Sequence, residues 1–144
     1  MKGNMQWFPW AMGSAAFAAL TTLLAKKGLE GVDPDLATLW RTVIILVMLA
    51  GWVMAAGKWT NPMALPARPM VYLILSGLAT GASWLCYYRG LHLGPAAKVA
   101  TVDKFSLVLV ALLGQWLLLE RLNLREWAGV ALMAGGVLVL AMKR

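Results

Sequence analysis

The segment Pro95–Leu119 constrains the fold most, because it is long and apolar enough to cross a bilayer and yet contains charged residues. Lys98, Asp103 and Lys104 all lie in its first half. A charge inside the hydrocarbon costs several kcal/mol unless it is paired or hydrated, so an ionisable residue in a membrane span is a candidate functional site. The rest of the chain must therefore supply the surroundings that make three such residues tolerable.

The composition is that of a membrane protein. Hydrophobic residues make up 61% of the 144 residues and charged residues only 13%, whereas a soluble domain is about 25% charged. Lys and Arg mostly flank the apolar runs, so membrane topology explains the net charge of +7 better than nucleic-acid binding does. A single cysteine, Cys86, and a single histidine, His92, exclude an intrachain disulfide and a His-rich metal cluster. We expect no cofactor, no metal and no enzymatic activity.

Five apolar runs predict an all-α integral membrane protein in which residues 1–144 form a single transmembrane domain. The predicted spans are residues 7–24, 36–56, 70–88, 95–119 and 124–142. Asp33 is expected to cap the second helix, and Asn123 with Glu126 resembles a capping box before the last one.

Several residues within or beside these spans have structural interpretations. Arg41 interrupts the second span near its start, where its side chain can snorkel outward. Arg89 and His92 are expected in the turn after the third span. Glycines suited to close helix packing lie in the third and fifth spans, at Gly77, Gly81, Gly129, Gly135 and Gly136.

The distribution of Lys and Arg gives little preference for one orientation in the membrane. Five spans place the two termini on opposite sides, and each side then has five cations in loops or at chain ends; Arg41 and Lys98 lie shallow on the C-terminal side. So weak a bias favours insertion both ways and an antiparallel homodimer of five plus five helices. A parallel dimer, or pairing with another chain, is the alternative.

The run Gly77–Ala141 resembles the EamA domain of the drug/metabolite transporter superfamily. The features that carry this resemblance are a small-residue third span ending in YYRGLHLGPA, the charged fourth span, Glu120 after an apolar run and the Gly-rich last span. The opening WAMGSAAFAALTTLLAKKGLEGVDPDLATLWR also fits, so the resemblance extends over roughly residues 7–142.

This resemblance implies a prokaryotic inner-membrane transporter, often an exporter of amino acids or other small metabolites. Most proteins of the family have two EamA units in one chain, so a single unit implies a partner, most simply an inverted copy. The related small multidrug resistance proteins use a carboxylate in the first helix for proton-coupled export of cations. Residues 7–24 contain no Asp or Glu, so this chain departs from that mechanism.

The charged residues of the fourth span have two interpretations. Asp103 and Lys104, near the middle of the span, form a structural ion pair that locks helices together, or they line a cavity and bind substrate or exchange a proton. Lys98 lies nearer the start of the span, where it joins this set or snorkels outward. The set is net positive, which favours an anionic or zwitterionic substrate.

Aromatic and hydroxyl residues complete the candidate site. Trp84, Tyr87 and Tyr88 form a patch at helical spacing that is either a wall of the site or an interface belt. Ser14 and Thr80 either bond substrate or bond their own helix.

The expected function is export of small metabolites by alternating access in a dimer. A dual-topology channel and a helper subunit of a two-chain transporter are the alternatives.

Overall fold

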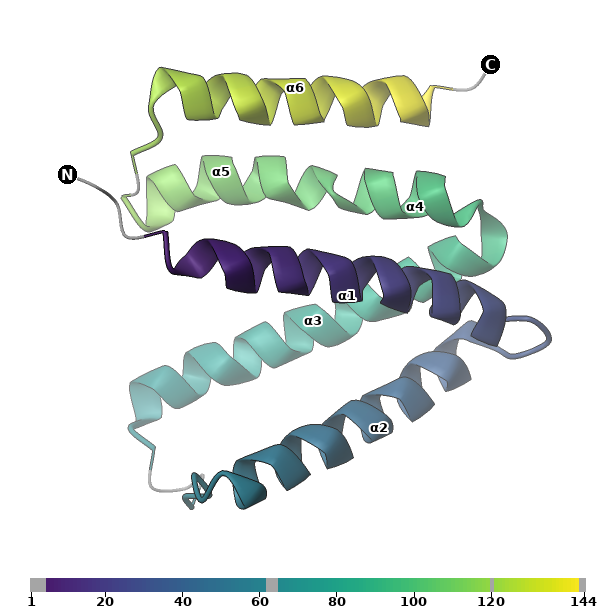
Figure 1. Ribbon diagram of the computed structural model, residues 1–144, viewed down its shortest axis with the longest axis vertical. Helices are drawn as coiled ribbons and strands as arrows, with labels where there is room; N and C mark the ends of the chain where they lie inside the picture. The colour runs from purple at the N-terminus through teal and green to yellow at the C-terminus, as the bar shows by residue number, and fades with distance from the viewer. Residues whose placement is uncertain (1–4, 62–64, 120, 143–144) are drawn as a thin grey trace. The chain divides into compact units, whose positions relative to one another are not determined.

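The computed structural model describes residues 5–61, 65–119 and 121–142, and over these residues the regular structure is entirely helical. The helices follow one another along the chain, joined by short connections (Figure 1). They are α1 (Trp7–Gly28), α2 (Pro34–Ala55), α3 (Ala67–Leu93), α4 (Ala96–Asp103), α5 (Phe105–Leu117) and α6 (Leu124–Ala141).

Four of these helices are long and apolar enough to cross a membrane, and they correspond to four of the five predicted spans. They are α1, α2, α3 and α6. The third helix is longer than expected. Arg89 and His92 lie inside α3 and not in a turn, because nothing in the sequence stops the helix before Gly94–Pro95.

The prediction of one continuous helix over residues 95–119 is wrong, because the helix is divided at Lys104 into α4 and α5. The N–H of Lys104 donates to the carbonyl of Thr101 at 3.1 Å, and the N–H of Leu107 donates to the carbonyl of Lys104 at 3.0 Å. These i to i−3 bonds make a tighter turn than an α-helix. Neither α4, with 8 residues, nor α5, with 13, is long enough to span alone.

Both predicted helix caps are confirmed. The side chain of Asp33 accepts from the N–H groups of Asp35 and Leu36 at 2.9 and 3.1 Å, which satisfies backbone donors at the start of α2. Asn123 and Glu126 form a reciprocal capping box at the start of α6, with bonds of 2.6 and 3.0 Å. Glu120, which contributes to the family resemblance, lies outside the described residues.

The chain divides into two compact units, and residues 24–93 form one of them. Here α2 and α3 pack together as an antiparallel hairpin (Figure 1). The buried residues gather near the start of α2 and the end of α3: Leu29, Thr38, Tyr88 and Leu91. The Nζ of Lys26 also donates to the backbone carbonyl of Leu91, so this end is held by both apolar and polar contacts.

The described parts of residues 1–23 and 94–144 make the other unit. In it α6 lies alongside α4 and α5 (Figure 1). The buried positions are Gly114 on α5 and Val137 on α6.

Most large apolar side chains of the described chain face outward. No described residue of α1 is buried, and long stretches of α2, α3 and α5 expose Leu, Ile, Val and Trp. This is the surface expected of a protein whose solvent is lipid. Among the described residues, a Cβ added at Gly77, Gly81, Gly129, Gly135 or Gly136 would meet nothing within 4 Å, so close helix packing at these glycines remains a prediction.

Candidate substrate site

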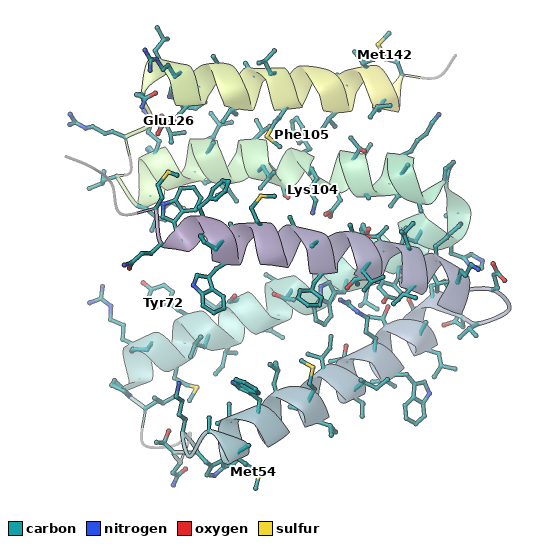
Figure 2. The ribbon with its side chains drawn as sticks, viewed as in Figure 1. Met54, Tyr72, Lys104, Phe105, Glu126 and Met142 are labelled. Carbon is teal, nitrogen blue, oxygen red and sulfur yellow. The ribbon has the colours of Figure 1, made fainter. Side chains whose placement is uncertain are left out.

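The break between α4 and α5 contains an ion pair between consecutive residues. The Nζ of Lys104 lies 3.5 Å from a carboxylate oxygen of Asp103, and the two side chains are 51% and 37% exposed. Figure 2 labels Lys104 and Phe105 at this position, where the two helices meet. Because Asp103 and Lys104 are consecutive residues, their ion pair does not join two packed helices. Within the described residues, neither side chain pairs with a residue of another helix, as a structural lock would require. At 3.5 Å the contact is longer than a good charge-assisted hydrogen bond, so the pair can open for another ion.

Lys98 belongs to the same short helix and is exposed. It forms no ion pair within the described part of the chain. One carboxylate, that of Asp103, therefore stands among two ammonium groups on this stretch, and the net positive charge predicted from the sequence is retained. Because such charge is costly in hydrocarbon, it needs water, a partner chain or an anion beside it.

The aromatic patch surrounds a residue that was not predicted as part of a site. The guanidinium carbon of Arg41 lies 4.4 Å from the ring centroid of Trp84 and 5.5 Å from that of Tyr88. Tyr87 meets Tyr88 edge to face at 6.4 Å. The head group of Arg41 thus packs against the neighbouring helix, and whether it also snorkels toward the membrane surface remains a prediction.

An ion pair shows the register of α2 against α3. Arg89 donates to both carboxylate oxygens of Asp35, at 3.0 and 2.7 Å. In antiparallel helices this pairing places a residue about six positions after Asp35 beside one about five positions before Arg89, which is where Arg41 and Trp84 meet. The same rule that singled out Lys104, an ionisable residue inside a span, would have singled out Arg41 too.

The two predicted hydroxyl residues differ in their surroundings. The Oγ1 of Thr80 donates to the carbonyl of Ser76 at 2.8 Å, so it bonds its own helix. Ser14 is an exposed residue of α1. A role for either in binding substrate remains a prediction.

The predicted site residues thus fall into two groups. Asp103, Lys104, Lys98 and Ser14 belong to one compact unit, and the aromatic patch with Thr80 belongs to the other. That both groups line one cavity remains a prediction. Among the described residues, no group of three or more His, Cys, Asp or Glu side chains could hold a metal ion.

Comparison with known proteins places this chain among membrane transporters. The EamA-like transporter family matches residues 5–142. A Sinorhizobium protein named "Uncharacterized transporter in cobO 3'region" is 52% identical over 139 residues, covering 96% of this chain and 99% of that protein.

Two more distant relatives are also transport proteins by name. The probable 4-amino-4-deoxy-L-arabinose-phosphoundecaprenol flippase subunit ArnE of Proteus mirabilis is 24% identical over 90 residues, covering 62% of this chain and 80% of the relative. The uncharacterized transporter YwfM of Bacillus subtilis is 27% identical over 134 residues, covering 91% of this chain and 44% of YwfM. No solved structure matches significantly.

These matches confirm the resemblance seen in the sequence, and the apolar helices agree with them. The chain is an integral bacterial membrane protein, and it belongs to the EamA-like transporter family.

Proposed function

We propose that this membrane transporter exports small anionic or zwitterionic metabolites by alternating access in an antiparallel homodimer. One observation carries the proposal: the net-positive set Lys98, Asp103 and Lys104 lies where a predicted span is broken. Charge that is costly in lipid and weakly paired is what a site for a charged substrate requires.

The charges of the site match a zwitterion. A substrate carboxylate can replace Asp103 beside Lys104, while a substrate ammonium pairs with the released Asp103 carboxylate. Because the Lys104–Asp103 distance is 3.5 Å, opening the pair gives up little hydrogen bonding. A cation without an acidic group would meet two ammonium groups for one carboxylate and would be repelled.

The break itself supports a mechanism in which the site changes access. The tight turn at Lys104 joins two helices without a continuous α-helical ladder, and such turns often mark hinges. Broken helices with charged groups at the break are a recurrent way to build substrate sites in secondary transporters. We infer that α4 and α5 together form the fourth span and tilt about Lys104.

A second copy of the chain is the simplest partner. The chain matches 44% of the length of YwfM, in keeping with one unit where two are usual. The open glycines on α3 and α6 leave surfaces on which another helix can pack closely. The near-equal Lys and Arg counts on the two sides favour an inverted copy.

Transport by the purified protein tests this function. Reconstituted vesicles would be loaded with unlabelled amino acids or dicarboxylates, and uptake of the labelled compounds followed. We expect saturable counterflow that Lys104→Gln lowers strongly. Arg125→Gln, which removes an exposed cation in the first turn of α6, is the matched control and should leave counterflow unchanged. Passive ion current under voltage in place of counterflow would instead indicate a channel.

Cysteine labelling tests the antiparallel arrangement. In a Cys86→Ser background, single cysteines at Val32 and Thr60 mark loops on opposite sides of the membrane and leave the Lys and Arg counts unchanged. For dual topology we expect a membrane-impermeant maleimide to label about half of each population in intact cells. Complete labelling at one position and none at the other would contradict the inverted dimer.

A second candidate function is that of a subunit in a two-chain transporter. It is favoured by the Proteus relative, which is named as a flippase subunit for an aminoarabinose joined to phosphoundecaprenol. That substrate carries an amine and a phosphate, and the set Lys98, Asp103 and Lys104 could bind both. Purified protein that forms no dimer and shows no counterflow alone, but gains it with a second EamA chain, would favour this function.

A further inference from the structure

We propose that Arg41, packed against Trp84 and Tyr88, is a binding residue for an oxyanion, either a carboxylate or a phosphate group. Arg41 is none of the residues predicted to form the substrate site. The proposal needs neither the Asp103–Lys104 pair nor a dimer, so it does not rest on the proposed function.

The first argument is depth. Arg41 is seven residues after Pro34, the first residue of α2, so its backbone lies about 10 Å along the helix from its start. Its guanidinium then packs against the ring of Trp84, which precedes Arg89 on α3. The head group is thus kept beside α3, against Trp84 and Tyr88.

The second argument is the lack of a counter-ion. The acidic residues of this unit are Glu30, Asp33 and Asp35, all six or more residues before Arg41. Asp35 uses both of its oxygens on Arg89, and Asp33 caps α2. Within the described part of the chain, Arg41 has ring contacts but no ion pair and no hydrogen bond.

The third argument is the donor capacity of Arg41. A guanidinium has five N–H donors, and among the described residues none of those of Arg41 makes a hydrogen bond. A guanidinium with free donors binds a carboxylate or phosphate through two parallel hydrogen bonds. The rings also exclude water from one side of the charge, which strengthens its attraction for an anion. An oxyanion would satisfy both the charge and the donors of Arg41.

The experiment is calorimetric titration of the full-length protein in phosphatidylcholine nanodiscs. Sodium succinate and sodium phosphate are the anionic probes, and choline chloride is the cationic control. The variants are Arg41→Met, which removes the charge, and Arg41→Lys, which keeps the charge but not the two-pronged geometry. Arg68→Met, at an exposed arginine in the first turn of α3, is the matched control.

We expect the wild type and Arg68→Met to bind at least one anion and not choline. Arg41→Met should weaken binding by roughly tenfold to a hundredfold, and Arg41→Lys by a smaller factor, since two charge-assisted hydrogen bonds are lost or weakened. Circular dichroism and gel filtration show whether each variant is folded. If Arg41→Met does not fold, Arg41→Lys carries the test.

A second arm separates a soluble anion from a lipid headgroup. The Tm is measured with and without phosphatidylglycerol in the nanodiscs. An increase that depends on Arg41, without binding of succinate or phosphate, assigns the site to a lipid phosphate.

Two outcomes overturn the proposal: a wild type that responds to none of these anions, or folded Arg41 variants that respond as the wild type does. If Arg41→Met binds anions normally while Lys104→Gln abolishes counterflow, this inference fails and the proposed function stands. The reverse pattern leaves the anion site in place and removes the transport role of Lys104.

Discussion

Lys104 and Arg41 are both cations within predicted spans, but the structure surrounds them differently. Lys104 is paired with its own neighbour, Asp103, at a break in the helix, and about half of its side chain is exposed. Arg41 lies in an unbroken helix and packs against two rings of another helix. The first arrangement is local and easily opened. The second depends on the register of two helices, so the two sites should respond differently to mutation.

The largest effect is expected from Asp103→Asn. This change leaves Lys104 without its counter-ion and removes the group that would bind a substrate ammonium. We expect counterflow of zwitterionic substrates to fall at least about tenfold, since a hydrogen bond to a charged group contributes about 1.5–3 kcal/mol. Glu30→Gln, at an exposed acid outside the predicted site, should leave counterflow unchanged. Normal transport by Asp103→Asn would remove this residue from the site.

Exchanging the two residues separates a structural pair from a binding position. The double variant Asp103→Lys with Lys104→Asp keeps adjacent opposite charges but moves each by about 100° around the helix. We expect the Tm of the double variant to stay near that of the wild type. Its counterflow should remain as low as that of the two single variants. Recovery of counterflow would instead show that only the presence of a pair matters.

The next prediction concerns the stability of the folded protein and not its transport activity. Trp84→Leu removes the ring nearest to Arg41, and we expect a loss of about 1–3 kcal/mol, because both ring packing and the cation–π contact disappear. Trp116→Leu is the matched control, since Trp116 is 78% exposed and should tolerate the change within about 0.5 kcal/mol. Reversible unfolding in a mixed detergent system measures both. Equal losses of stability in the two variants would mean that the contact between Arg41 and the Trp84 ring contributes nothing to stability.

Features set by neighbouring residues could be predicted from the sequence. The cap at Asp33 and the capping box of Asn123 and Glu126 were predicted because each uses residues no more than three positions apart. The apolar runs likewise predicted the four long helices, since membrane thickness sets their length.

Features that depend on longer-range geometry could not be predicted. The break at Lys104 has no Gly or Pro to signal it and follows from i to i−3 hydrogen bonding around Thr101. The position of Arg41 follows from the register between α2 and α3, which no local pattern of either helix specifies. A side chain able to snorkel outward or to pack sideways gives the same sequence pattern in both cases.

The smallest effect is expected at the ion pair between Asp35 and Arg89, which links α2 to α3. Asp35→Asn removes one charge from the two-bonded contact with Arg89, and both side chains are substantially exposed. Exposed ion pairs contribute little and are screened by salt. We therefore expect a decrease in Tm smaller than that of Trp84→Leu, present at low ionic strength and absent at high ionic strength, with Glu30→Gln as the control.

A decrease as large as that of Trp84→Leu, unaffected by salt, would mean that the ion pair and not the apolar cluster of Leu29, Tyr88 and Leu91 holds α2 in register. The position of Arg41 would then depend on the ion pair between Asp35 and Arg89. Arg41 and Lys104 would both rely on an ion pair, and they would differ only in how far apart the paired residues lie in the sequence.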